Sequence, residues 1–173
     1  MLKDDFPRLP LTGNLELFRA LARLGGELTA LHLLEFDERS AGFQPASFIN
    51  GGRDAHPPVE KIQWSADILS ASPKSGQDAR TPLGTVWLDK AQITGFRGVS
   101  EAVWNFHIGG YQVCAKWLKD RKGRTLTPDD LAHCQKIVVA LAETIRLMAE
   151  IDEVIGKHGG WPGAFNANAQ MTA

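Results

Sequence analysis

Cysteine is scarce in this sequence. Only Cys114 and Cys134 occur among 173 residues, and neither belongs to a CxxC pair. The five histidines add no metal-ligand spacing, so the pattern argues against a zinc site and against a disulfide scaffold. We therefore expect no metal in this chain. Two unpatterned cysteines are typical of proteins in a reducing cytoplasm, which is the location we expect.

An excess of charge of one sign is also missing. The formal net charge is -1, so whole-molecule charge neither favours nor excludes a nucleic-acid partner, and any electrostatic argument must rest on a local patch. No run of eighteen apolar residues occurs, so we expect no membrane-spanning helix. Residues 1–10 carry four charged side chains in place of the apolar core of a signal peptide.

Catalytic motifs are the third absence. The chain has no GxxxxGK[ST] phosphate loop, no GxGxxG, no HExxH, no GxSxG, and no Asn-Pro-Pro-Tyr or Asp-Pro-Pro-Tyr run of an adenine methyltransferase. His107 could act as a base, but no acid or nucleophile accompanies it at a telling spacing, which favours a structural or DNA-facing role. The carboxylate pair Asp129-Asp130 is explained by helix capping. We expect no catalytic residue in this chain.

Two long amphipathic helices are predicted. The first covers residues 15–35, with leucines and Phe18 at three- and four-residue spacing, and Gly25-Gly26 leaves a bend or a break open. The second covers residues 127–155. Thr127 suits its N-cap, Pro128 its first turn, and Asp129 and Asp130 the positive end of its dipole.

Between the long helices the pattern is mixed. Residues 36–80 are rich in turn and loop signals, and strands are predicted at 59–64, 84–89 and 91–96. Ser100 can cap a short helix over 101–105, and a second short helix is predicted over 111–121. The fold class is therefore α+β, with two long helices plus short helices packed on a small, mostly antiparallel sheet with long loops. One domain is expected over residues 1–158, followed by a flexible tail over 159–173.

A group of aromatic residues falls within the two short helices. Its spacing fits packing against the second long helix better than a base-stacking platform. The residues are Trp104, Phe106, Tyr111 and Trp117.

The densest basic run lies at the end of the second short helix. Its five cations, against the single anion Asp120, are Lys116, Lys119, Arg121, Lys122 and Arg124. Cations at a helix C-terminus are favoured by the helix dipole, so a solvated helix end is one interpretation. Contact with DNA phosphates is the other.

A second candidate is the polar segment from Asn50 to Lys61, which includes Arg53 and His56. Loops carried on a rigid scaffold are common reading elements, and Asn and Arg can each make paired hydrogen bonds to base edges in the major groove. An ordinary surface connection stays equally open. Asn50, Arg53 and Lys61 complete the set of candidate DNA contacts.

Two long runs in the second half of the sequence resemble a known family. They are residues 98–113, with Trp-Asn-Phe-His-Ile-Gly-Gly-Tyr-Gln-Val, and residues 116–124, with Lys-Trp-Leu-Lys-Asp-Arg; the segment 140–145 continues the match. The runs at 5–11, 15–18 and 28–33 look like the start of the same domain. Together they resemble the C-terminal specificity domain of type ISP restriction–modification enzymes, across most of residues 5–155.

The resemblance implies a function. It implies a non-catalytic target-recognition segment that reads a short sequence in double-stranded DNA. The nuclease, ATP-driven motor and adenine-specific methyltransferase of such an enzyme would lie outside this chain. S-adenosylmethionine, ATP and magnesium would then belong to those parts, and no cofactor is expected here. The match is weakest over 36–82, so the bases that would be read, independent activity and oligomeric state stay open.

One alternative comes from a different class of protein. The chain could be an interaction module that docks onto a separate methyltransferase or motor subunit, with the helix over 15–35 as its contact face. Salt response separates the two hypotheses, because phosphate binding releases counterions and weakens steeply as salt rises.

Overall fold

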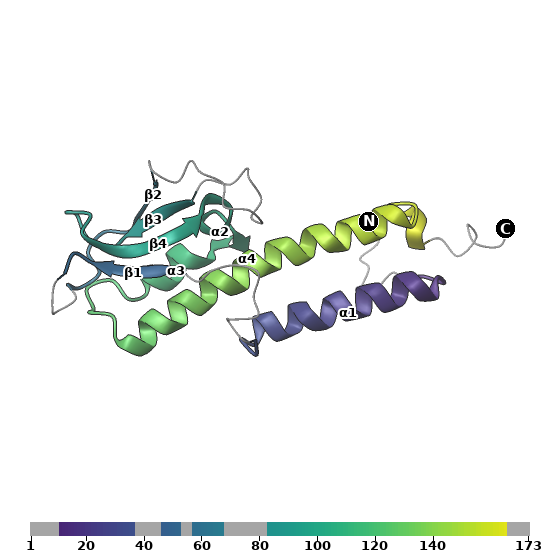
Figure 1. Cartoon of the computed structure of the whole chain (residues 1–173), viewed down its shortest axis with the longest axis horizontal. Helices are drawn as coiled ribbons and strands as arrows, with labels where there is room; N and C mark the ends of the chain where they lie inside the picture. The colour runs from purple at the N-terminus through teal and green to yellow at the C-terminus, as the bar shows by residue number, and fades with distance from the viewer. Residues whose placement is uncertain (1–10, 37–45, 53–56, 68–82, 166–173) are drawn as a thin grey trace, which may run out of the picture. The chain divides into compact units, whose positions relative to one another are not determined.

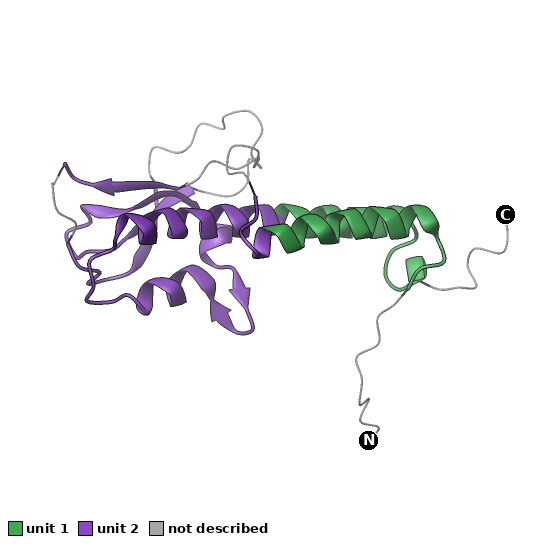
Figure 2. Cartoon of the chain, turned by 90° about the horizontal axis from the view of Figure 1, so that it is seen from below, with its two compact units in different colours: residues 1–30, 146–173 green, residues 31–145 purple. Residues whose placement is uncertain are grey.

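The computed structural model describes residues 11–36, 46–52, 57–67 and 83–165. The chain divides into two compact units, which Figure 2 shows in different colours. Unit 1 consists of residues 1–30 and 146–173, and unit 2 of residues 31–145. Much of the segment 36–80, with its turn and loop signals, lies outside the described residues.

Unit 2 contains a four-stranded antiparallel sheet (Figure 1). Its strands are β1 (Ser47–Asn50), β2 (Gln63–Ala66), β3 (Leu83–Trp87) and β4 (Thr94–Ser100), in the order β1-β4-β3-β2. A separate two-stranded hairpin joins β5 (His107–Ile108) to β6 (Tyr111–Gln112). Together with the helices, these strands confirm the α+β class and the small antiparallel sheet.

The core of unit 2 lies between one face of the sheet and the helices. Phe96 and Val99 of β4 and Val86 of β3 are almost fully buried. They share one hydrophobic cluster with Val103 of α2 (Glu101–Trp104), with Cys114 and Leu118 of α3 (Val113–Lys119), and with Cys134, Val138 and Leu141 of α4 (Pro128–Lys157). Successive strand residues point to opposite faces, so the residues between these apolar positions lie on the other face of the sheet.

The helix starts follow the capping signals. The Asp130 backbone N–H donates to Thr127 Oγ1 (3.1 Å), and the Thr127 N–H donates to the Asp130 carboxylate (3.1 Å). This reciprocal pair satisfies donors that the first helical turn leaves without partners. Ser100 likewise caps α2, because its hydroxyl oxygen accepts from the Val103 N–H at 3.3 Å. Both predicted caps are confirmed.

Unit 1 is built around α1 (Leu15–His32) and the second half of α4. The Asn14 side chain caps α1 by accepting from the N–H groups of Glu16 and Leu17, at 2.9 and 3.1 Å. Leu17 and Leu24, one heptad apart, are fully buried. The helix continues through Gly25-Gly26. These two glycines therefore do not break the helix.

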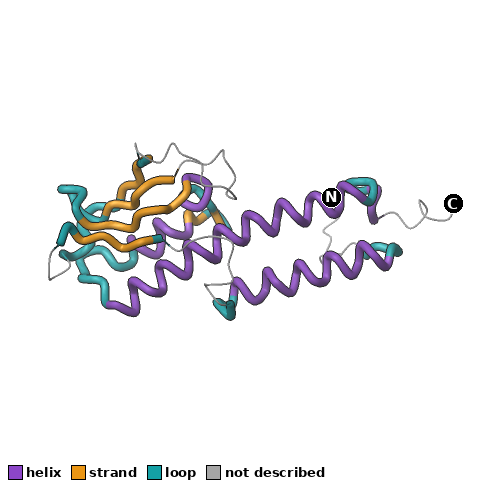
Figure 3. Tube along the Cα trace, viewed as in Figure 1, coloured by secondary structure: helices purple, strands orange, loops and turns teal. Residues whose placement is uncertain are grey.

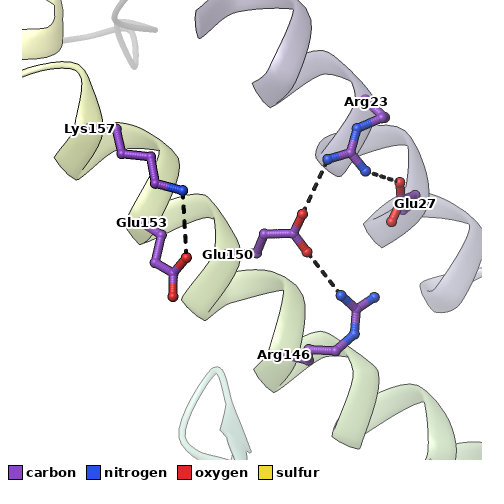
Figure 4. A network of polar contacts seen from close by, with 6 residues as sticks. All are labelled: Arg23, Glu27, Arg146, Glu150, Glu153 and Lys157. Atoms are coloured by element: carbon purple, nitrogen blue, oxygen red, sulfur yellow. Dashed lines mark hydrogen bonds and ion pairs between the residues drawn. The ribbon is translucent and has the colours of Figure 1, made fainter. Parts of the chain in front are cut away.

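Charged side chains also link the two helices of unit 1 (Figure 4). Arg23 of α1 lies 3.2 Å from Glu150 of α4, and Arg146 lies 2.9 Å from the same carboxylate. Arg23 also pairs with Glu27, and hydrogen bonds from Glu150 and Glu27 raise the pKa of its guanidinium. The arginine side chains are more than half exposed, so solvent screens these pairs and each contributes little to stability.

The start of the expected tail has defined structure. A short 3-10 helix, η1, covers Gly163–Phe165, and Ala164 is buried. Its carbonyl oxygen accepts from the Thr12 hydroxyl at 2.9 Å. Residues 166–173 lie outside the described residues, so the flexible tail stays a prediction there.

Four local differences separate the sequence predictions from the structure. Strand β1 was not predicted, and the strand predicted over 91–96 begins only at Thr94, because residues 89–93 form a turn that the buried Asp89 carboxylate holds. The strand predicted over 59–64 is shifted to β2, with Val59 left in an isolated bridge. Tyr111 was predicted as core, but its side chain is 64% exposed on the β5–β6 hairpin.

Candidate nucleic-acid interface

The basic run ends α3 and enters the connection to α4. Lys116 and Lys119 lie in the last turn of α3, and Arg121, Lys122 and Arg124 follow it. Gly123 has a φ of 79°, a left-handed conformation that glycine adopts without strain, and it turns the chain away from the helix. We call residues 119–124 the basic turn.

Arg121 is committed to the protein itself. Its Nε lies 2.9 Å from Asp130 Oδ1, its guanidinium lies 3.6 Å from the centre of the Trp117 ring, and it donates to the Trp117 carbonyl oxygen at 3.2 Å. The Arg121 hydrogen bond, supported by Thr127, lowers the pKa of Asp130 to about 2. Arg121 therefore joins the end of α3 to the start of α4.

The other cations of the basic run differ in their partners. Lys116 pairs with Asp120, with Nζ 2.6 Å from Oδ1 and both side chains about half exposed. Lys119, Lys122 and Arg124 are exposed, and within the described part of the chain no side-chain ion pair or hydrogen bond engages them. These three cations are thus available to an external anion.

The backbone brings Lys61 close to this turn. Val59 N–H donates to the Arg124 carbonyl at 3.0 Å, and Gly123 N–H donates to the Val59 carbonyl at 2.8 Å. Lys61 N–H in turn donates to the carbonyl of Leu88, just beyond β3. The segment with Lys61 therefore connects the basic turn to the end of β3. Figure 1 draws this end of the sheet on the left, where α4 also begins.

The remaining predicted contacts are separate from the basic turn. Asn50 ends β1, and its Oδ1 accepts from the buried Thr94 hydroxyl at 3.1 Å. Arg53 and His56 lie outside the described residues. Lys61 is exposed. The structure thus places Lys61 with the basic turn and places Asn50 at the end of the sheet where β4 begins.

A hollow of about 540 Å³ lies beside Asn50. Its lining includes Ile49, Trp87, Gln92, Ile93 and Arg97. None of these was a candidate from the sequence. Trp87 stands between the apolar residues Val86 and Leu88, and this alternation could have shown that its ring faces away from the core. The approach of β1 to the β3–β4 turn, by contrast, has no signal in the sequence.

Loops and turns gather at this end of the sheet, as Figure 3 shows in teal. The Asp89 carboxylate fixes the turn between β3 and β4, because it accepts from the N–H of Ile93 at 3.1 Å and of Thr94 at 2.7 Å. Burial raises the pKa of Asp89, but these hydrogen bonds outweigh burial and the net pKa is lowered. A charged, satisfied Asp89 keeps the turn rigid.

Within the described ranges, no group of three or more His, Cys, Asp and Glu could hold a metal ion. Cys114 and Cys134 are free and buried, and burial raises the pKa of the Cys114 thiol to about 12 and also raises the pKa of Cys134. The exposed His107 has its Nδ1 2.6 Å from the carbonyl oxygen of Asn105, a local contact.

The helices described are also not long and apolar enough to cross a membrane.

The comparison with protein families decides the assignment. Residues 1–150 match the model of the type ISP C-terminal specificity domain. This chain belongs to that family. The resemblance carried by residues 98–113 and 116–124 is thereby confirmed, and the family assigns the specificity domain a role in target recognition in type ISP systems. Searches of the curated proteins and of the solved structures found no match.

Proposed function

We propose that this type ISP specificity domain binds double-stranded DNA and that its basic turn contacts the phosphates. The observation that carries the proposal is the set of Lys119, Lys122 and Arg124, exposed and without side-chain partners in the described residues. Phosphate contacts supply most sequence-independent affinity, and they position a protein on the duplex. Lys61 extends the same surface, because the backbone of Val59, two residues earlier, is hydrogen-bonded to the turn.

The proposal assigns no chemistry to this chain. The domain recognises the target, while methylation and ATP-dependent cleavage belong to the methyltransferase and nuclease parts of the system, with S-adenosylmethionine, ATP and magnesium. Those parts are the expected protein partners. DNA recognition of this kind takes place in the cytoplasm.

The test is fluorescence anisotropy of the full chain with a labelled duplex of mixed sequence. Three phosphate contacts should weaken binding roughly 40-fold between about 50 and 200 mM salt. The variant K119A/K122A/R124A should bind more weakly and lose most of this salt dependence. The control R19A/R146A/K157A removes the same number of charges from unit 1 and should bind like the wild type.

Two results would contradict the proposal. Wild-type affinity in the folded triple variant would exclude the basic turn as the phosphate contact. No binding by the folded wild type at either salt concentration would exclude DNA binding by the chain alone.

A second candidate function is docking onto the methyltransferase or motor part. Unit 1 exposes large apolar side chains, which are Leu11, Leu15, Phe18, Met148 and Trp161, each about half exposed or more. Exposed apolar groups of this size mark interaction surfaces when they are contiguous. If docking is the function, F18S/W161S should abolish co-elution of the chain with that part of a type ISP enzyme, and co-elution should tolerate high salt.

A further inference from the structure

The hollow lies on the face of the sheet that the helices leave uncovered. Its side chains come from the strand positions between core residues. Trp87 stands between Val86 and Leu88, and Ile49 follows Phe48, which packs against the core. Because side chains alternate along a strand, Trp87 and Ile49 point away from the core.

A glycine stands between two of the residues that line the hollow. Gly95 of β4 pairs with Ile49 of β1 on one side and with Trp87 of β3 on the other. A Cβ at Gly95 would collide with the Val86 carbonyl oxygen, so only glycine fits here. The row Ile49–Gly95–Trp87 therefore has large side chains at its ends and none in the middle.

The hollow has a fixed aromatic wall. The Trp87 Nε1–H donates to Ser65 Oγ on β2 at 2.8 Å, which sets the orientation of the indole. With its N–H group satisfied inside the sheet, the exposed part of the ring is an apolar contact surface. Ile49 and Ile93 add to this surface.

Two side chains with several hydrogen-bonding groups border the hollow. Arg97, two residues after Gly95 in β4, is exposed, and no ion pair or hydrogen bond of its side chain involves the described residues. Gln92 lies in the β3–β4 turn with a φ of 56°, in the left-handed region. A glutamine in this conformation costs about 1–2 kcal/mol relative to the right-handed one, and glycine would avoid the cost.

We propose that Arg97 and Gln92 read base edges of double-stranded DNA, with the Trp87 wall in apolar contact with a neighbouring base. An arginine makes paired hydrogen bonds to guanine, a glutamine does so to adenine, and apolar groups contact the thymine methyl. This inference rests on the proposed DNA-binding function and names the residues that would give it sequence preference.

Exposed cations at this end of the sheet favour DNA as the molecule that binds there. Lys90 in the β3–β4 turn and Lys61 beside the end of β3 are exposed cations. The Lys61 segment is hydrogen-bonded to the basic turn, so phosphate contacts and base contacts would share one end of unit 2. Among the carboxylates there, Asp89 is buried in the turn, whereas Glu60 is exposed and opposes the cations.

The experiment selects preferred sites from a library of randomised duplexes, using the full chain and sequencing the bound fraction. The variants are R97A and Q92G, because glycine suits the left-handed φ and should leave the fold intact. R19A, an exposed arginine of unit 1, is the matched control. Mixed-sequence affinity is measured in parallel by anisotropy.

The expected result is that the wild type and R19A enrich the same motif. R97A should lose at least about tenfold preference at a guanine, and Q92G at an adenine, which corresponds to the 1–3 kcal/mol of one paired contact. Their affinities for mixed sequence should change far less. An unchanged motif in both variants, or no motif from wild type that still binds DNA, overturns this inference alone. Absence of any DNA binding overturns the proposed function as well.

Discussion

Cations that stand next to one another in this sequence have different roles in the structure. Arg121 stacks on Trp117 and pairs with Asp130, and so it stabilises the connection between α3 and α4. Lys122, its neighbour, is exposed. An alanine scan of the basic run would therefore mix two effects. Loss of Arg121 should reduce stability, whereas loss of Lys119, Lys122 or Arg124 should reduce affinity for an anionic partner.

The pair of Arg121 and Asp130 leads to a prediction on pH. The pKa of Asp130 is about 2, below its ordinary value of 3.8, so the charged carboxylate favours the folded state. Its contribution is complete above about pH 4 and is lost as the pH falls through about 2. We expect D130N to unfold about 1 kcal/mol more easily in urea at pH 7, with the difference shrinking toward pH 2.

The neighbouring residue provides the control for this substitution. Asp129 lies in the same first turn of α4 and is exposed, so D129N removes a charge near the helix dipole without breaking the Arg121 pair. It should cost only about 0.3–0.5 kcal/mol. Equal losses for D129N and D130N would show that the dipole, and not the specific pair, accounts for the effect.

At the scale of secondary structure, the sequence predicted helices better than strands. The signals of α4 are local, since Thr127, Pro128 and Asp130 lie within its first turn, and the structure confirms them. Strand β1 has four residues and no hydrophobic alternation of useful length, and its partner β4 is more than forty residues away. Its place depends on long-range pairing that a local pattern does not contain.

The turn after β1 gives a prediction for this element. Gly51 has a φ of 53°, and a Cβ there would collide with Ile93 Cγ2. Gly52 also has a positive φ of 73°, but a Cβ there would meet nothing within 4 Å. We expect G52A to lose about 1–2 kcal/mol of folding stability from backbone strain and G51A to lose more, because overpacking adds to it.

Thermal unfolding of the two variants, followed by circular dichroism, tests this difference. G51A should have the lower melting temperature. If both variants melt together, Ile93 moves aside at little cost, and the approach of β1 to the β3–β4 turn is looser than the structure indicates.

At the scale of the whole chain, the family could be assigned from the sequence, whereas the hollow could not be predicted from it. The family assignment came from long runs around Trp104 and Trp117, whose residues are mostly exposed or partly buried. The hollow was not predicted, because it depends on Gly95 standing between Ile49 and Trp87 on three separate strands. Base-reading residues of this kind become visible only after the register of the sheet is known.

The division into two units leads to a prediction for the whole molecule. Leu24 is fully buried in unit 1, and Val86 is buried in the sheet of unit 2. L24A should cost about 2–5 kcal/mol and should speed amide hydrogen exchange mainly in residues 11–30 and 146–165. V86A should speed amide hydrogen exchange mainly in β3 and β4. Mass spectrometry of exchange in both variants measures this directly.

The same variants connect stability with function. The basic turn and the hollow both belong to unit 2, so L24A should retain its salt-dependent DNA binding under conditions in which unit 1 exchanges rapidly. V86A should lose that binding as the sheet opens. Equal acceleration of exchange across both units in L24A would instead mean that α1 and α4 transmit unfolding through the whole chain, and DNA binding would then be lost together with the packing around Leu24.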